Sequence, residues 1–483
     1  MFNLLSNNII DLFFNGGNVS MNWIAKLISG LVGAIGIVGI GVIVFTLILK
    51  VITLPLDIYS KASMRKNNLK MEKMRPQLEK LQKQYADNQQ MYNQKMMEMY
   101  KKNGYSMFGA CLPMIVSLVV FIIVLNAFSS YSKYMDVDLF NSMANDYSAA
   151  VLEYAPDESF TPTETISALV ATGEKDKDGN DLYKLTRKVT YDDDKSYITI
   201  VETQTVITTD STLKAEDIDF TDTKKYPVST EYFVETEVMM ADSSISESLN
   251  TLKTAYLTEK QAELDEEYEE NPEEFTEKPV ASITDDELCA LYMKNIGREA
   301  AEKSYHENRV GFLWVKNIWY PDTAFNHPIK SYKDLGIKGD KYLSENFYNE
   351  ITYNLKGEFK QPNGYFILIV ISIGTMFLSQ FIMSKSQKAQ NELQTANGQG
   401  AKTQKMMMII MPVMFGIFSF MYSAAFSIYM IISSVWGILS TLVINYFINK
   451  KYKKLEEKEL QEKYNRRIPN RNTSDFKRSN KKR

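Results

Sequence analysis

The sequence predicts a mainly α-helical, polytopic membrane protein with five transmembrane helices, a cytoplasmic helical hairpin and an inserted extracytoplasmic α+β domain. Two observations carry this prediction: apolar blocks without charge, and segregated charges between them. The blocks are Leu27–Leu49, Asn103–Ser132, Gln361–Ser384 and Met406–Asn449. A bilayer core of roughly 30 Å needs about 20 apolar helical residues. Since the last block has 44 residues, we expect it to form two helices that turn near 422–427.

The sign of the charges predicts the side of the membrane on which each segment lies. Residues 57–105 hold 11 Lys and Arg against 5 Asp and Glu, and residues 450–483 hold 14 against 5. Residues 131–364 are the reverse, with 24 basic and 47 acidic side chains. Because basic segments stay in the cytoplasm, five helices place the N-terminus outside and the C-terminus in the cytoplasm. The first residues show neither a cleaved-signal pattern nor a transit-peptide pattern, which favours a bacterial plasma membrane.

These patterns divide the chain into consecutive segments. We expect an outer-surface amphipathic segment over 1–26, transmembrane helices over 27–56, 106–130, 363–384, 406–424 and 425–449, the cytoplasmic hairpin over 57–105, the inserted extracytoplasmic domain over 131–311, an extracytoplasmic connector over 312–362, a cytoplasmic loop over 385–405, and a basic cytoplasmic tail over 450–483. Pro55 is expected to end or kink the first of these helices, because proline lacks the backbone N–H that a helix interior uses.

Two apolar stripes lie in the hairpin segment. One follows heptad-type spacing at Met71, Met74, Leu78, Leu81 and Tyr85; the other, after a break at 87–88, consists of Tyr92, Met96 and Met99. The stripes either face each other as the hairpin's own packing or present a surface to apolar partners. Because unbranched, polarizable methionine adapts to many apolar shapes, a candidate substrate-receiving surface is formed by Met91, Met96, Met97 and Met99.

The acidic segment 131–311 predicts a domain of mixed structure. Alternating apolar and polar residues predict strands over 183–190, 197–206 and 230–238. Helices are expected over 243–265 and 284–306, the second with a capping box, and loops over 157–163, 172–181 and 266–277. The sequence has no Gly-rich phosphate loop, no metal-spaced His/Cys set and no catalytic triad. We therefore expect no enzyme activity, no cofactor and no metal site.

Lys50 lies near the inner end of the first apolar block and is followed by six uncharged residues, 51–56. A cation at mid-bilayer costs about 2.5 to 3.5 kcal/mol, which favours a functional reason for it. Snorkelling is the alternative: six residues place Lys50 roughly 9 Å from the helix end, which a lysine side chain almost spans. On this residue alone, both interpretations stay open.

Five motifs follow one another along the chain. They are 46–56 (TLILKVITLPL), 74–82 (MRPQLEKLQ), 97–113 (MEMYKKNGYSMFGACLP), 312–322 (FLWVKNIWYPD) and 405–418 (KMMMIIMPVMFGIF). Together, and with the order of the five helices, they resemble the YidC family of membrane protein insertases. The resemblance covers residues 22–131 and 311–464.

The resemblance implies an insertase and chaperone that receives nascent apolar segments at the cytoplasmic face and passes them into the bilayer through a hydrophilic groove. It implies that Lys50 takes the place of the family's groove arginine. The other expected groove residues are Thr46, Ser117, Asn126, Gln380, Tyr429 and Ser434. The implied partners are nascent membrane proteins, the ribosome and the lipid bilayer, with the Sec translocon as a further candidate. The tail residues expected to contact the ribosome or anionic lipid are Arg466, Arg467, Arg471, Lys477 and Arg478.

The chain also departs from the family pattern. Lysine at position 50 keeps the charge of the arginine but loses the guanidinium's fork of donors. Family members with a large outer domain carry it before this first helix, whereas here it follows the second. An anion-binding transport protein or channel is the alternative function, although the sequence shows neither broken helices nor an inverted repeat. A receptor anchored by its helices is a third possibility, which leaves the methionine cluster and the basic tail unexplained.

Overall fold

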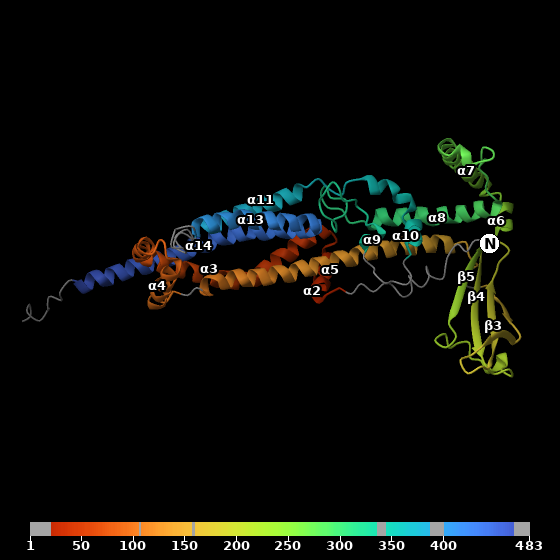
Figure 1. Cartoon of the computed structure of the whole chain (residues 1–483), viewed down its shortest axis with the longest axis horizontal. Helices are drawn as coiled ribbons and strands as arrows, with labels where there is room; N and C mark the ends of the chain where they lie inside the picture. Colours follow the sequence, from red (N-terminus) through yellow and green to blue (C-terminus); the bar gives the residue numbers. More distant parts are fainter. Residues whose placement is uncertain (1–20, 106–107, 157–159, 336–343, 387–399, 468–483) are drawn as a thin grey trace, which may run out of the picture. The chain divides into compact units, whose positions relative to one another are not determined.

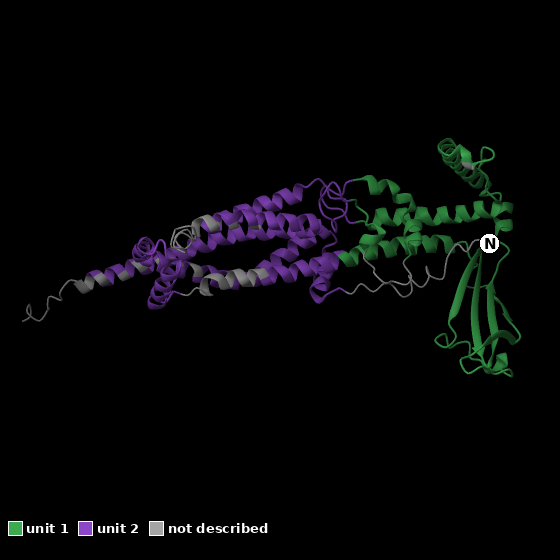
Figure 2. Ribbon diagram, viewed as in Figure 1, with its two compact units in different colours: residues 1–20, 133–309, 327–361 green, residues 21–132, 310–326, 362–483 purple. Residues whose placement is uncertain are grey.

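The computed structural model describes residues 21–105, 108–156, 160–335, 344–386 and 400–467. These residues form two compact units (Figures 1 and 2). The helical unit comprises the described residues within 21–132, 310–326 and 362–483, and the sheet unit comprises those within 133–309 and 327–361.

The helical unit is built from long helices that pack side by side (Figure 1). Its described helices are α2 (Trp23–Ile35), α3 (Val38–Gln84), α4 (Gln89–Lys102), the first part of α5 (Phe108–Leu152), α11 (Ile367–Ser386), α13 (Gly400–Met421) and α14 (Ala424–Arg467). α14 packs against α3 and α11, and α11 also packs against α13. Within the described residues, α3, α11 and α14 are long and apolar enough to cross a membrane. The chain is therefore a mainly helical membrane protein, and the count of five spans stays a prediction.

An aromatic contact joins three of these helices. The ring of Phe128 on α5 lies 6.0 Å from that of Phe45 on α3 and 5.7 Å from that of Tyr429 on α14. Phe128 and Phe45 are both buried. Aromatic pairs at such separations add to the free energy gained by burying their area, so α5, α3 and α14 form one core.

The first apolar block forms two helices, where the sequence predicted one helix over 27–56. Gly36 ends α2 with φ of 77°, a left-handed conformation that glycine adopts without steric cost. α3 then begins at Val38 and runs through Pro55 and Pro76 to Gln84. Pro55 therefore does not end the helix. The absence of charge over Leu27–Leu49 could not reveal a break that depends on a glycine C-cap.

The end of α3 and all of α4 pack through one apolar cluster. Its buried members are Met71, Met74, Leu78, Tyr92, Met96, Tyr100 and Tyr105. The two stripes thus face each other. The Asn88 side chain caps α4 by accepting from the Met91 backbone N–H at 3.0 Å.

Of two further helix boundaries, the turn between α13 and α14 agrees with the sequence prediction and the end of α5 does not. α13 ends at Met421 and α14 begins at Ala424, at the start of the expected turn. α5 instead continues to Leu152, although the second transmembrane helix was expected to end at 130. Nothing in the polar residues after 132 breaks a helix, so a prediction based on apolarity alone stops too early.

The sheet unit holds an antiparallel sheet and several helices. Its elements are the second part of α5, β1 (Thr163–Ile166), β2 (Val170–Lys175), β3 (Asp181–Tyr191), β4 (Ile198–Thr208), β5 (Val228–Val234), α6 (Thr236–Ala241), α7 (Ser246–Glu270), α8 (Asp285–Asn308), α9 (Tyr332–Leu335), α10 (Glu345–Ile351) and the 3-10 turns Ala215–Asp217, Pro272–Glu274 and Tyr353–Lys360. β1 and β2 both pair with β3, which pairs with β4, and β4 pairs with β5. Leu185 lies opposite Val206, and Ile198 lies opposite Val234.

The sequence predicted the main elements of this unit. The three expected strands overlap β3, β4 and β5, and Thr284 with Glu287 forms the capping box of α8. The third strand was expected to reach 238 but ends at Val234, and Thr236–Ala241 forms α6 instead. Two expected loops were wrong in part: β2 occupies 170–175, and α7 extends to Glu270. Glycine and charged residues suggested loops there, but β2 pairs with β3, and charged residues suit an exposed helix.

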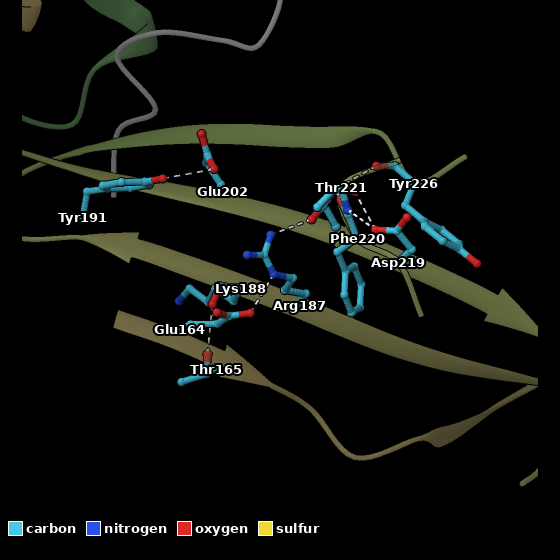
Figure 3. A network of polar contacts seen from close by, with 11 residues as sticks. Glu164, Thr165, Arg187, Lys188, Tyr191, Glu202, Asp219, Phe220, Thr221 and Tyr226 are labelled. Carbon is cyan, nitrogen blue, oxygen red and sulfur yellow. Dashed lines mark hydrogen bonds and ion pairs between the residues drawn. The ribbon is translucent and has the colours of Figure 1, made fainter. Parts of the chain in front are cut away.

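Two apolar cores hold the sheet unit together. The larger joins the second part of α5 to α8, α10 and one end of β4 and β5, with Tyr147, Met293 and Tyr305 at its centre. The smaller lies under the loop 209–227 and includes Leu185 and Val206. Polar contacts fasten the same loop (Figure 3): Arg187 donates to Glu164 at 2.7 Å and to Gln204 at 2.8 Å. Gln204 in turn donates to the carbonyl oxygens of Phe220 and Tyr226.

Candidate functional site

One face of α3 carries two of the predicted groove residues and two further ionisable side chains. Thr46, Lys50, Asp57 and Lys61 are spaced by 4, 7 and 4 residues, so a period of about 3.6 residues puts them on one side of the helix. Lys50, Asp57 and Lys61 are half-buried, and Thr46 is fully buried. The Thr46 hydroxyl donates to the Val42 carbonyl at 2.7 Å. Its single O–H donor therefore bonds within α3, and only its oxygen can accept from another group.

Lys61 connects this face of α3 to α14. Its Nζ donates to the Ser440 Oγ at 2.6 Å, and the Ser440 hydroxyl donates onward to the Gly437 carbonyl at 3.2 Å. The Asp57 carboxylate attracts both lysines, and the two lysines repel each other. Lys50, Asp57 and Lys61 therefore form a single electrostatic group with a net charge of +1 when all three are ionised.

The α14 helix contributes three buried hydroxyls. Ser427 and Ser434 lie seven residues apart and therefore near one face of the helix, whereas Ser440, six residues further on, lies about a third of a turn away from them. The Ser427 Oγ has no hydrogen-bond partner within the described residues. A buried hydroxyl in that state is a place where water or a polar group of another molecule gains a hydrogen bond. Tyr429, also expected in the groove, is buried among aromatic rings, with Phe426 at 5.8 Å.

The remaining predicted groove residues belong to two other helices, Ser117 and Asn126 to α5 and Gln380 to α11. Asn126 is exposed, and its backbone oxygen accepts from the Asn22 side chain at 3.4 Å. Gln380 is half-buried on α11. The side chain of Ser117 lies outside the described part of the structure.

The candidate methionines divide into two sets. Met91 and Met97 are exposed by 40% and 39%, whereas Met96 is buried at 7% and Met99 packs partly against the same cluster. Of the four candidate methionines, Met91 and Met97 thus present the most apolar surface on α4. Of the basic tail residues, Arg466 and Arg467 end α14 but their side chains are outside the described structure, as are Arg471, Lys477 and Arg478 altogether.

A buried aspartate that sequence reasoning missed fastens the beginning of α11. Asp322 is completely buried. Its carboxylate accepts from the Tyr365 N–H at 2.8 Å, the Leu368 N–H at 2.6 Å and the Trp314 indole at 3.2 Å. It thereby satisfies a backbone donor in the first turn of α11, which has no partner within its own helix.

The same segment, 310–326, also fastens α14 and α5. The Ala424 and Ala425 N–H groups donate to the Tyr320 and Ile318 carbonyls at 2.7 and 3.0 Å. The Ser132 hydroxyl of α5 donates to the Trp319 carbonyl at 2.7 Å. The segment therefore closes one end of the helical unit with buried hydrogen bonds. Its residues belong to a recognised motif, but no local pattern tells which distant backbone groups they satisfy.

Comparison with known proteins places these residues in a family. The family model described as 60Kd inner membrane protein matches residues 30–173 and 288–454, more than half of the chain. A curated relative from Fusobacterium nucleatum, named membrane protein insertase YidC, is 35% identical over 103 residues. The chain belongs to the YidC family.

Other YidC relatives match over similarly short stretches. The protein of that name from Leptospira interrogans is 36% identical over 104 residues, and that from Jannaschia is 40% identical over 95 residues. The matches to the Fusobacterium, Leptospira and Jannaschia proteins cover 21%, 22% and 20% of this chain and 48%, 15% and 14% of the relatives. The chain thus spans less than half the length of these YidC relatives. No solved structure matches it.

The match to the YidC family model has an internal gap at 174–287. The gap contains β3, β4, β5, α6 and α7, whereas α8 from residue 288 onward and all of α5 lie within the matched ranges. Most of the sheet is therefore an addition to the family pattern, and the long α5 is part of that pattern.

Proposed function

We propose that this chain is a membrane protein insertase that receives nascent apolar segments at the cytoplasmic face and passes them into the bilayer through a hydrophilic groove containing Lys50. Membership of the YidC family carries the proposal. The half-buried Lys50 on the polar face of α3, a helix that packs against α14 and its buried hydroxyls, supports it.

The physical task is to reduce the cost of moving a polar tail through an apolar layer. Buried polar groups without partners cost free energy, and a wet, hydroxyl-lined path along α3 and α14 lowers that cost. The Lys50 ammonium would attract carboxylates of the tail. The apolar segment would then move sideways into lipid, driven by its own transfer from water. No nucleotide is required in this scheme.

The proposal includes an orientation. Five spans with the N-terminus outside and the C-terminus in the cytoplasm put the beginnings of α11 and α14 at the outer surface. The hydrogen-bonded segment 310–326 would then seal the path from outside. On the cytoplasmic side, the exposed Met91 and Met97 would receive the apolar segment, and the basic tail would contact the ribosome or anionic lipid. The Sec translocon is a further candidate partner.

Complementation tests the proposal. Cells depleted of their own insertase should grow when they express this chain. Lys50→Arg should retain activity, and Lys50→Gln should insert acidic-tailed substrates about fivefold more slowly, since a partly exposed charge pair is worth at most about 1 kcal/mol. Lys50→Glu should be worse still, because it repels the tail.

The matched control is Lys26→Gln, which removes an exposed lysine from α2. It should behave like the unchanged chain. If Lys50→Gln also inserted every substrate at the unchanged rate, the charge in the groove would have no role. Failure of the unchanged chain to restore growth, despite normal amounts in the membrane, would count against insertion itself.

A further inference from the structure

Lys61 has the features of a second cation site on the same path. It lies on the same face of α3 as Lys50, eleven residues further along the chain, which is about 16 Å along the helix axis. Its ammonium is half-buried and held by the Ser440 hydroxyl at 2.6 Å. An ammonium has three N–H donors, and this bond to Ser440 uses one of them.

The Ser440 hydroxyl is oriented by its own helix and can therefore hold Lys61 in place. The Ser440 hydroxyl proton goes to the Gly437 carbonyl, which leaves the oxygen lone pairs to accept from Lys61. Asp57 lies between the two lysines along the helix and attracts both. Because Asp57 compensates one of the two positive charges, an incoming carboxylate meets a net charge of +1 and not +2. Such a group attracts an acidic residue without holding it strongly.

We propose that Lys61 is the entry-side site for acidic residues of the substrate's translocated tail, that Ser440 positions it, and that Asp57 limits how tightly the tail is held. This inference rests on the insertase function proposed above and specifies its substrate class. An acidic residue contacts Lys61 first and Lys50 second. Since extended chain advances about 3.4 Å per residue, two acidic residues about five positions apart reach both lysines at once.

The experiment uses the purified full-length chain in liposomes and a single-span substrate whose tail becomes protease-protected on insertion. Four tails are compared: one neutral, one with a single Asp, and two with a pair of Asp residues spaced by two or by five positions. The variants are Lys61→Gln, Lys61→Arg, Ser440→Ala and Asp57→Asn. The matched control is Lys66→Gln, which removes an exposed lysine from another face of α3.

Lys61→Gln should slow insertion of the acidic tails about fivefold, the effect of one partly exposed charge pair, and should leave the neutral tail unchanged. The loss should be largest for the pair spaced by five. Lys61→Arg should restore the rate, and Ser440→Ala should give a smaller loss with the same dependence on tail charge. Asp57→Asn should slow release of the tail with two acidic residues, so that it accumulates in a form that crosslinks to the protein.

Each contrary outcome has a distinct meaning. If Lys61→Gln matches Lys66→Gln while Lys50→Gln remains slow, the entry site is wrong and the proposed function stands. If Lys61→Gln slows neutral and acidic tails equally, Lys61 supports the α3–α14 packing only, and the inference is overturned. If the unchanged chain inserts none of the four tails, the failure lies with the proposed function.

Discussion

At the scale of single residues, Asp136 predicts a pH dependence of stability in the sheet unit. It lies on α5, is buried, and accepts a hydrogen bond from the Lys330 ammonium. Burial raises the pKa of Asp136 to about 6, against the opposing charge of Lys330. Between about pH 4 and pH 6 the folded chain keeps a proton that the unfolded chain has released. The unfolding free energy should therefore fall as pH rises through this window, by up to about 3 kcal/mol at about 1.4 kcal/mol per pKa unit.

Thermal unfolding of the detergent-solubilised chain between pH 4 and pH 7 measures this effect. Asp136→Asn should flatten the curve in that window. Asp146→Asn, which changes an exposed carboxylate on the same helix, should keep the slope of the unchanged chain. Equal slopes in all three proteins would show that Asp136 does not titrate in this range.

Asp322 predicts a large loss of stability of the helical unit. Its carboxylate satisfies two backbone N–H groups and the Trp314 indole at once. Asp322→Ala would remove the acceptor of all three donors, of which the Leu368 N–H is buried and would stay unsatisfied at about 1 to 3 kcal/mol, while the two partly exposed donors add less. We expect a loss of about 2 to 4 kcal/mol in the unfolding free energy, measured by thermal unfolding in detergent. Asp322→Asn, which keeps one acceptor oxygen, should lose less; a loss as large as that of Asp322→Ala would mean that the charge alone matters.

At the scale of elements, the sequence predicted the helices, strands and turns that are determined by residues close together in the chain. The alternation of β3 and β4, the capping box of α8 and the turn before α14 each depend on residues close together in the chain. The break at Gly36 and the continuation of α5 to Leu152 were missed, because apolar composition says little about where a helix ends.

In the candidate site, too, the sequence reveals the residue with a local signal and misses the one that depends on a distant partner. Lys50 stands out because a charge in an apolar block has a known cost. Lys61 does not stand out among the many lysines of a basic segment, and its partner Ser440 is 379 residues away in the sequence. Only the packing of α14 against α3 brings the two together.

The contact between α5 and α8 predicts a steric effect at Gly297. A Cβ there would come within 2.6 Å of the Tyr147 ring, which is itself buried. Gly297→Ala should therefore force the two helices apart and cost about 1 to 3 kcal/mol, as overpacking does in cores. Gly357→Ala is the control, because a Cβ at Gly357 has no atom within 4 Å. Indistinguishable unfolding temperatures of the two variants would mean that α5 and α8 adjust without strain.

At the scale of the whole molecule, the additional sheet can be separated from the family pattern. The YidC family model leaves 174–287 unmatched, and the helical unit has its own core, which includes Phe45 and Phe128. Every residue assigned to the proposed path and its entry site lies in the helical unit. Insertion should therefore not require the sheet.

Replacing 156–283 by a 12-residue Gly/Ser linker tests this independence. The start of α8 lies about 18 Å along its axis from Gly297, which contacts α5, and a linker of that length reaches about 40 Å when extended. The shortened chain should insert substrates within about twofold of the full chain, because function resides in a site rather than in the whole fold. It should unfold at a lower temperature, since Met293 and Val151 lose part of the apolar core contributed by Tyr197 and Tyr232. If insertion fails while near-UV circular dichroism still reports a folded protein, the sheet contributes directly to the handling of substrates.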